Sequence, residues 1–215
     1  MRNRAAKKVL SRHFKNLEFV IFHESSLLKI DMYLIMLLSN MWNLKFIDIS
    51  SDFSVPDNFI WTGKSEFPLG YSLMCRFHYF HVWKYLKHYE WAIRIDEDCI
   101  IESIPDVANL RPFTVGAISS ETHSRTNQTL PVLLKEVGAD GYYDHKFPYT
   151  NVFITQTKYW LQKEVQEFFS YIASDIACLE NRWGDLPILG VASKDRKSTR
   201  LNYSHVSESR MPSSA

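Results

Sequence analysis

The chain has 215 residues, 46% of them hydrophobic and 23% charged, which suits one domain with a sizeable core and leaves little for a second. The formal net charge of +1 shows no basic excess, so a general nucleic-acid-binding protein is not expected. No apolar run reaches the roughly 18 residues of a membrane-spanning helix, so the chain as written is expected to be soluble. Its three cysteines, Cys75, Cys99 and Cys178, are widely spaced. They match neither a disulfide framework nor a zinc site and are expected to be small buried residues.

The first elements follow a β-α-β order. Residues 17–22 (LEFVIF) are rich in β-branched and aromatic side chains and predict a strand. Residues 27–41 carry apolar side chains at helical spacing after a serine pair that can cap a helix. Residues 45–49 (KFIDI) predict a second strand. This order favours a parallel sheet with a right-handed crossover.

The rest of the chain continues the alternation of strands and helices. Residues 50–68 contain breakers typical of a loop, and residues 70–88 predict a helix with Met74, Phe77, Phe80, His81, Tyr85 and Leu86 on one side. Further strands are predicted over residues 91–95, 113–118 and 152–155, and helices over residues 159–173 and from residues 184–187 onward. The fold class is therefore α/β, with a Rossmann-like, mostly parallel sheet flanked by helices.

The last residues differ in kind from the rest. Residues 1–194 are expected to form the domain, whereas residues 195–215 are rich in Ser and Arg, lack apolar periodicity and are expected to be disordered. This tail is similar to translated adaptor sequence, so we expect it to be an artefact and the domain to be incomplete at its C-terminus. His205 lies in this tail and is not counted among the site residues.

Three consecutive carboxylates follow the predicted third strand. Residues 91–95 lead directly into Asp96, Glu97 and Asp98. Ligands of parallel α/β sheets bind beyond the carboxyl ends of the strands, which is where this triplet is expected. Positions i and i+2 of an extended chain point to the same side, so Asp96 and Asp98 can converge while Glu97 faces away. Two convergent carboxylates form the hard oxygen site that Mn²⁺ or Mg²⁺ prefers.

The triplet alone leaves other interpretations open. A solvated acidic turn would have the same composition, although the apolar flanks on both sides argue against a loose surface loop. A metal-dependent nucleotidyl or phosphoryl transferase also needs paired carboxylates. That class usually adds a third acidic ligand or a glycine-rich phosphate loop, and the chain has seven glycines and no such loop.

Five blocks between residues 71 and 192 occur in the order of a known family. They are YSLMCRF (71–77), YEWAIRIDED (89–98), VGAISSET (115–122), YTNVFITQTKYW (149–160) and ENRWGDLPILGVA (180–192). With these blocks the sequence resembles the fungal Golgi α-1,2-mannosyltransferases of glycosyltransferase family 15. The Met-Cys-Arg-Phe and Arg-Trp-Gly-Asp-x-Pro blocks are the specific ones. The resemblance implies a GT-A fold and retaining transfer of mannose from GDP-mannose to a mannoside or glycan acceptor, with Mn²⁺ or Mg²⁺ as cofactor.

The resemblance also implies roles for residues that match the family blocks. Asp98 would be the principal ligand of the metal and diphosphate, supported by Asp96. Tyr71 and Arg94 would line the donor pocket, and Arg76 would be a structural or phosphate-facing cation. As alternatives, Tyr71 could be a packing residue and Arg94 the partner of a structural carboxylate.

Three further residues would act near the reacting sugar. Glu121 and Asp185 would contact sugar hydroxyls, and Asn151 would lie near the reacting carbon. Asp185 also stands where a helix N-cap is expected, with a proline in the first turn. Trp183 is expected to be a core anchor.

Two departures from the family matter for activity. The family places a glutamate two residues after the asparagine, where this chain has Phe153. A histidine metal ligand downstream of the Arg-Trp-Gly-Asp block is also expected, and it would lie beyond Lys194. These departures leave open a non-catalytic glycan- or nucleotide-binding remnant of the same fold. Family resemblance suggests a membrane-associated protein of the Golgi lumen.

Overall fold

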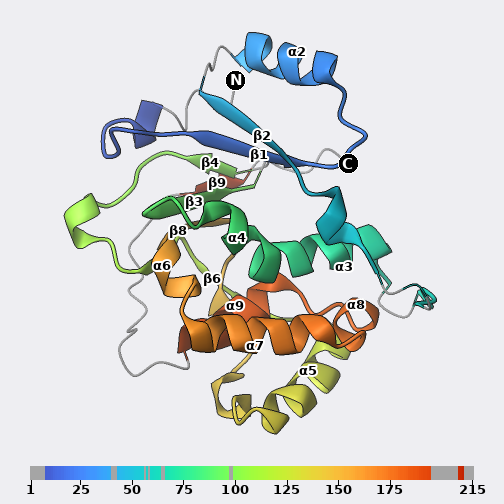
Figure 1. Ribbon diagram of the computed structural model, residues 1–215. Helices are drawn as coiled ribbons and strands as arrows, with labels where there is room; N and C mark the ends of the chain where they lie inside the picture. Colours follow the sequence, from blue (N-terminus) through green and yellow to red (C-terminus); the bar gives the residue numbers. More distant parts are fainter. Residues whose placement is uncertain are drawn as a thin grey trace.

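The computed structural model describes residues 8–39, 43–55, 57, 59–63, 66–96, 99–194 and 208–210, and Figure 1 shows their arrangement. The strands are β1 (Phe19–His23), β2 (Leu44–Asp48), β3 (Trp91–Ile95), β4 (Cys99–Ile101), β5 (Phe113–Val115), β6 (Ile118–Ser120), β7 (Lys146–Pro148), β8 (Val152–Gln156) and β9 (Glu208–Arg210). The α-helices are α2 (Lys29–Ser39), α3 (Leu69–Arg76), α4 (Val82–Leu86), α5 (Ser124–Glu136), α6 (Thr157–Trp160), α7 (Lys163–Ser174), α8 (Ala177–Glu180) and α9 (Asp185–Lys194). A π-helical turn, η2 (Phe77–His81), joins α3 to α4, and short 3₁₀ turns are η1 (Ser50–Phe53), η3 (Val107–Asn109) and η4 (Asp140–Tyr142).

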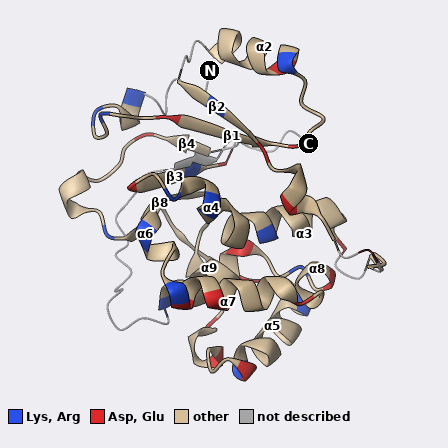
Figure 2. Cartoon of the chain, viewed as in Figure 1, with Lys and Arg blue, Asp and Glu red and all other residues tan. Residues whose placement is uncertain are grey.

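The β-α-β opening is present as expected. β1 and β2 pair in parallel with Phe19 opposite Leu44 and His23 opposite Asp48, and α2 connects them. Phe22 packs its ring against Phe77, with centroids 5.0 Å apart, and this contact fixes the pair to the central helix. α2 lies on the other side of β1 and β2, at the top of Figure 1, and it contains no buried residue. Between Lys29 and Ser39 its only charged residues are Lys29 and Asp31 (Figure 2).

The remaining described strands pair in antiparallel fashion. β8 lies between β3 and β5 and runs antiparallel to both. β6 pairs with β7 and β4 with β9, again antiparallel. The predicted α/β class is thus confirmed. The predicted mostly parallel pairing is not found among the described strands, because β8 runs opposite to both β3 and β5 and only β1 and β2 pair in parallel. β9 falls in the segment expected to be disordered; the rest of that segment lies outside the described residues, so its disorder stays a prediction.

Residues 69–86 form one helical rod with a change of winding in its middle. The π turn inserts an extra residue, so the buried face shifts along the rod. The residues predicted on one side differ in burial: Phe77 is buried, whereas Met74, Phe80, His81, Tyr85 and Leu86 are partly buried. The fully buried hydrophobic side chains of the rod are Leu73, Cys75, Phe77, Tyr79, Val82 and Trp83, and Phe80, Tyr85 and Leu86 pack against the same core.

The main core lies between this rod, the three-stranded sheet and the C-terminal helices. Trp83 stacks on Trp160 with centroids 5.2 Å apart, and Phe113 meets the edge of Trp160 at 4.9 Å. α9 packs so closely on β7 that a Cβ at Gly190 would overlap the ring of Phe147. These contacts fix the start of α9 relative to the sheet. The three cysteines are free and buried, as expected.

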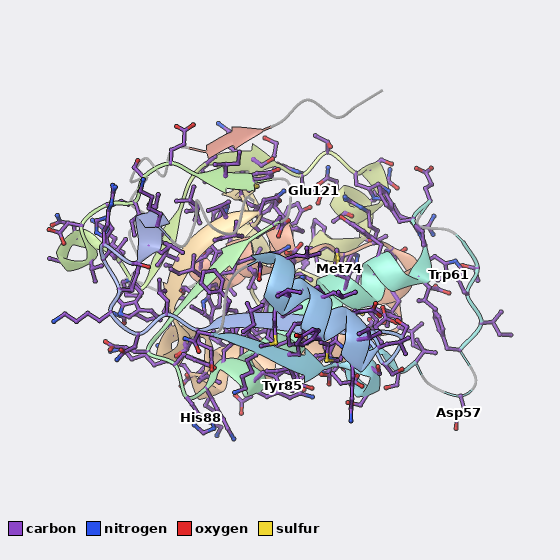
Figure 3. All side chains as sticks on the ribbon, turned by 90° about the horizontal axis from the view of Figure 1, so that it is seen from above. Asp57, Trp61, Met74, Tyr85, His88 and Glu121 are labelled. Carbon is purple, nitrogen blue, oxygen red and sulfur yellow. The ribbon has the colours of Figure 1, made fainter. Side chains whose placement is uncertain are left out.

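Two predicted elements are divided in the structure. The strand expected over residues 113–118 forms β5 and β6, which join different partner strands. The helix expected over residues 159–173 is α6 followed by α7, and α7 buries Val165, Phe169 and Ile172. In the loop expected over residues 50–68, Asp57 and Trp61 lie at the edge of the molecule (Figure 3). No helix in the described part of the chain is both long and apolar enough to cross a membrane.

Candidate functional site

The candidate site begins where β3 ends. Asp96 directly follows β3, and its backbone N–H donates to the carbonyl of Asn151 at 2.8 Å. Asn151 stands just before β8, the neighbour of β3, so strand pairing brings these two sequence-predicted residues together. Glu97 and Asp98 lie outside the described residues. The convergence of Asp96 and Asp98 on a metal therefore stays a prediction.

Arg94 joins two of the predicted carboxylates. Its Nε lies 2.9 Å from Oδ1 of Asp96, and its Nη1 pairs with Oδ2 of Asp185 at the start of α9. Burial alone would lower the pKa of Arg94, but Asp185 and then Asp96 raise it above its ordinary value. Arg94 thus remains charged, and it links the end of β3 to a helix 91 residues further along the chain.

Asp185 is a buried carboxylate that stays ionised. Burial would raise its pKa, but Arg94 and then His78 and a hydrogen bond from Thr150 hold the pKa below its usual value. α9 begins at Asp185, so the residue lies in the first turn rather than at the expected cap position, and its carboxylate is bound by Arg94 and Thr150. The Cys75 thiol is also close: burial and then Asp185 raise the pKa of Cys75 to about 12.

A second group forms around Glu121 and Tyr71. The Oε1 of Glu121, which follows β6, accepts from the backbone N–H of His123 at 2.7 Å and lies 3.4 Å from Nη1 of Arg182. The Nη2 of the same guanidinium donates to the hydroxyl of Tyr71 on α3 at 3.2 Å. Burial and then Cys75 raise the pKa of Tyr71 to about 12, so this hydroxyl stays protonated and can donate.

The two groups are neighbours. Tyr71 and Cys75 lie one turn apart on α3, and both sense the charges of Arg182 and Asp185. The ends of β3 and β6 and the starts of α3 and α9 therefore meet at one polar cluster. It holds the carboxylates of Asp96, Glu121 and Asp185 and the guanidinium groups of Arg94 and Arg182.

Arg76 plays a different part. Its Nη2 donates to the carbonyls of Asp52 at 3.1 Å and Ser54 at 2.6 Å, which ties η1 to the end of α3. These bonds agree with the structural cation that the sequence left open for Arg76. A role toward phosphate stays a prediction.

Phe153 is an interior residue of β8. It stands opposite Arg94 in the strand register, is 4% exposed and meets the ring of Phe113 at 5.4 Å. Directly opposite residues share a face of a sheet, so position 153 lies on the same side as Arg94. The position at which the resemblance places the family's glutamate is therefore occupied here by a side chain of the hydrophobic core.

Three members of the cluster were not foreseen. Arg182 lies inside the Arg-Trp-Gly-Asp block, and that block was the signal that could have indicated it. Thr150 lies inside the block of residues 149–160, which could have indicated it in the same way, whereas His78 lies just outside the block of residues 71–77 and carries no such signal. Burial, followed by the charge of Arg94, lowers the pKa of His78 to about 4, so His78 is neutral near pH 7.

The described residues offer only part of a metal site. Among them, no three His, Cys, Asp or Glu side chains are grouped to hold a metal ion. Asp96 has the right chemistry for one ligand, since its carboxylate side chain is 31% exposed at the strand end. Arg94 contacts both of its oxygens, Oδ1 at 2.9 Å and Oδ2 at 3.5 Å. A hard cation could use this carboxylate together with a second carboxylate and phosphate oxygens.

Solved mannosyltransferases share this fold. The structure is similar to core-mannan synthase A (CmsA/Ktr4) from Aspergillus fumigatus in its Mn/GDP form, with a TM-score of 0.69, 14% identity, and coverage of 89% of this chain and 67% of that chain. It is also similar to the mannosyltransferase Ktr4p from S. cerevisiae in complex with GDP, with a TM-score of 0.71, 14% identity, and coverage of 89% and 61%. No protein-family model and no curated protein matches the sequence.

The comparison defines the class of fold. The chain has the GT-A-like α/β fold of fungal mannosyltransferases, so the resemblance read from the sequence blocks is confirmed at the level of the fold. The chain spans 60 to 67% of the length of the solved relatives.

Proposed function

We propose that this chain is the core of a metal-dependent mannosyltransferase. It would transfer mannose from GDP-mannose to a mannoside or glycan acceptor, with retention at the anomeric carbon and formation of an α-1,2 linkage. The fold is that of proteins whose structures hold GDP, in one case with Mn. The compartment proposed with this activity is the Golgi lumen.

The observation that carries the proposal is the bridge made by Arg94. It joins Asp96 at the end of β3 to Asp185 at the start of α9, and Tyr71 and Glu121 lie beside it. Sequence blocks chosen for their resemblance to one family thus supply neighbouring side chains. A chance set of short motifs would not be expected to meet at one point.

Asp98 and Asp96 are the proposed metal ligands. The fit rests on the described member of the pair: Asp96 is a carboxylate whose side chain is 31% exposed at the end of β3, and Arg94 contacts both of its oxygens. When bound, Mn²⁺ or Mg²⁺ would act as a Lewis acid toward the diphosphate leaving group. Arg94 holds Asp96 in place and adds positive charge beside the phosphates. Arg76 is the second cation proposed for donor binding.

The remaining residues would bind and orient the sugars. Asp185 is an ionised acceptor and Glu121 accepts a hydrogen bond from a backbone N–H, so both carboxylates suit sugar hydroxyls. Tyr71 offers a protonated hydroxyl as donor. The carboxamide of Asn151 would lie near the anomeric carbon, next to Asp96. Asp185, Glu121 and Tyr71 are each held by a contact to an arginine of the cluster, which limits reorganisation on binding.

Retention must occur here without a carboxylate at position 153. We propose departure and attack on the same face of the sugar. The bond from the anomeric carbon to the β-phosphate oxygen breaks, GDP leaves, and the acceptor oxygen forms the new bond to that carbon. The acceptor hydroxyl gives its proton to the departing phosphate oxygen. No covalent sugar–enzyme bond is then needed, which agrees with Phe153 being buried in the core.

Calorimetry and a transfer assay on the full-length protein test the proposal. GDP is expected to bind only with Mn²⁺ present, and mannose from GDP-mannose is expected to reach a methyl mannoside with an α-anomeric product by NMR. Asp98→Ala should abolish both. Glu97→Ala is the matched control, because its side chain is expected to face away and binding should persist. No GDP binding with Mn²⁺ present would refute the donor assignment.

A second candidate is a non-catalytic glycan- or nucleotide-binding remnant of the same fold. The buried Phe153 at the family's glutamate position favours it. Such a remnant would bind a mannoside without metal and would turn over no donor. Titration of methyl mannoside with and without Mn²⁺, together with the transfer assay, separates the two candidates.

A further inference from the structure

Arg182 has a backbone conformation that is uncommon for arginine. It follows α8 with φ +52°, in the left-handed region that glycine usually occupies at the end of a helix. The N–H of Trp183 donates to the carbonyl of Cys178 at 3.2 Å, as in the motif in which a left-handed residue ends a helix. The backbone at position 182 therefore favours glycine, and the arginine side chain needs a separate explanation.

The side chain of Arg182 makes four contacts that converge on the candidate site. Its Nη1 lies 3.4 Å from Oε1 of Glu121, and its Nη2 donates to the hydroxyl of Tyr71 at 3.2 Å. Its guanidinium carbon lies 4.5 Å from the ring centroid of Phe67 and 5.4 Å from that of Tyr71. Phe67 and Tyr71 stack on each other with centroids 4.8 Å apart.

The same residue fixes the approach to α9. Its carbonyl accepts from the hydroxyl of the buried Thr126 at 2.8 Å, and Asp185 follows three residues later. The Nε of Arg182 is buried with no hydrogen-bond partner within the described part of the chain. A left-handed backbone and a buried, unpaired N–H both oppose stability. Stability alone therefore explains the arginine poorly.

We propose that Arg182 is a positioning residue, whose guanidinium holds Tyr71 and Glu121 in a fixed relation while its backbone fixes the start of α9 and thus Asp185. This inference rests on the proposed function, because it is there that Tyr71, Glu121 and Asp185 bind the sugars. Arginine suits the task because its planar fork can bond two oxygens and stack on aromatic rings at once. Lysine cannot do so.

Three variants of the full chain test this role. Arg182→Gly removes the side chain and relieves the left-handed backbone, and Arg182→Lys keeps the charge without the fork. Arg125→Ala is the matched control: Arg125 Nε donates to Oδ1 of Asn181 at 2.7 Å, so it supports the same turn without touching Tyr71 or Glu121. The measurements are the kcat and KM for GDP-mannose, the urea midpoint of unfolding, and the ¹³C NMR signal of the Tyr71 ring, assigned with Tyr71→Phe.

Misplaced sugar-binding groups should lower kcat by about tenfold to a hundredfold in both Arg182 variants, with the donor KM changed by less than about threefold. The Tyr71 signal should move in both, and Arg125→Ala should leave kcat and the signal unchanged. An unchanged kcat in either folded Arg182 variant, or an equal loss in Arg125→Ala, overturns the proposal. Should Arg182→Gly fail to fold, Arg182→Lys decides.

The two proposals fail in different ways. If the unmodified chain neither binds GDP with Mn²⁺ nor transfers mannose, the proposed function is wrong. The NMR signal of Tyr71 then decides the positioning role alone: a signal that shifts in Arg182→Lys supports it, and one that stays in place refutes it.

Discussion

Two buried aspartates of this chain illustrate different uses of the same side chain. Asp52, in η1, is 5% exposed, bonds Lys84 and the hydroxyl of Tyr85 at 2.7 Å, and lies with its Oδ1 3.6 Å from Nδ1 of His81. These partners all lie within five consecutive residues at the end of one helical rod. The carboxylate of Asp52 therefore finds these partners on one short stretch of helix, and its contacts attach η1 to that helix.

Asp185 gathers its partners from separate parts of the chain. Arg94 comes from β3, Thr150 from the segment before β8, and His78 and Cys75 from the central rod. Burial would raise the pKa of either aspartate, yet bound cations and hydrogen bonds hold both below the usual value. The two clusters differ in what they connect. Through Arg94, Asp185 is linked to the partly exposed Asp96 at the end of β3, whereas Asp52 links η1 to the helical rod.

Replacement of Asp185 should have the largest effect. Asp185→Ala leaves the buried Arg94 with Asp96 as its remaining carboxylate partner among the described residues, and loss of one partner of a buried pair typically costs about 3–5 kcal/mol. We also expect kcat for mannose transfer to fall about a hundredfold or more, as for other removed electrostatic contacts at reacting groups. Urea unfolding and steady-state kinetics measure the two. Asp185→Asn, with similar volume, should retain more stability and still lose activity; a fully active folded variant would contradict the assignment.

Asp52→Ala should separate stability from activity. Its carboxylate has partners that reach toward solvent, with the Lys84 side chain 51% exposed, so we expect a loss of about 1–3 kcal/mol in the free energy of unfolding. Activity at saturating substrate should stay within about twofold, because no sugar-binding group is moved. A tenfold loss of kcat in folded Asp52→Ala would show that the two clusters are coupled and would break the comparison.

Each cluster contains one histidine that should make stability depend on pH. Burial lowers the pKa of His78 and of His81 from 6.5 to about 4. Between these values the unfolded chain binds protons that the folded chain does not, so the free energy of unfolding should fall as pH decreases from about 6.5 to about 4. With about 1.4 kcal/mol for each pKa unit, the buried His78 contributes at most on the order of 3 kcal/mol, and His81, which is less buried and therefore screened by solvent, contributes less.

In urea titrations at several pH values, His78→Gln should remove the larger part of this pH dependence and His81→Gln a smaller part. The lowered pKa of Asp185 acts in a different range. Its contribution to stability is present above the ordinary value of 3.8 and is lost as pH falls through the lower, folded value. A pH profile that is flat between 4 and 6.5 would show that neither histidine is held neutral by burial.

The smallest effect is expected outside both clusters. Lys163 and Glu167 on α7 lie 3.7 Å apart, with side chains 82% and 64% exposed. Exposed pairs of this kind contribute about 0.5 kcal/mol or less, so Lys163→Ala should barely change the urea midpoint or kcat. The Lys163→Ala variant gives the baseline for comparing the losses of unfolding free energy and of kcat in the variants of the two clusters. A loss above about 1 kcal/mol would mean that the unfolding assay overstates surface contacts.

Elements with a strong local pattern were predicted well. The strands at residues 17–22, 45–49 and 152–155 correspond to β1, β2 and β8 within two residues at each end. α5 and β7, by contrast, were not predicted. α5 carries Pro131 and several polar residues, so its sequence has a weak helical signal, and β7 is a three-residue strand that exists through its pairing with β6.

The candidate site was predicted as a set of residues rather than as a geometry. Asp96, Asn151, Arg94, Asp185, Tyr71 and Glu121 were identified from sequence blocks, and the structure brings them into one cluster. No block could reveal that Arg94 would bind two of the carboxylates at once. Their partners become fixed only when β3 pairs with β8 and α9 packs on β7.

The sequence by itself determined the α/β class, the opening β-α-β unit, the burial of the cysteines and the acidic residues at the end of β3, because these follow from local periodicity and residue chemistry. Tertiary structure alone decided the antiparallel course of β8, the π turn that shifts the helical face, and the meeting of Arg94 and Arg182 with their carboxylates. Those features depend on contacts between residues distant in the chain, and no local pattern encodes such contacts.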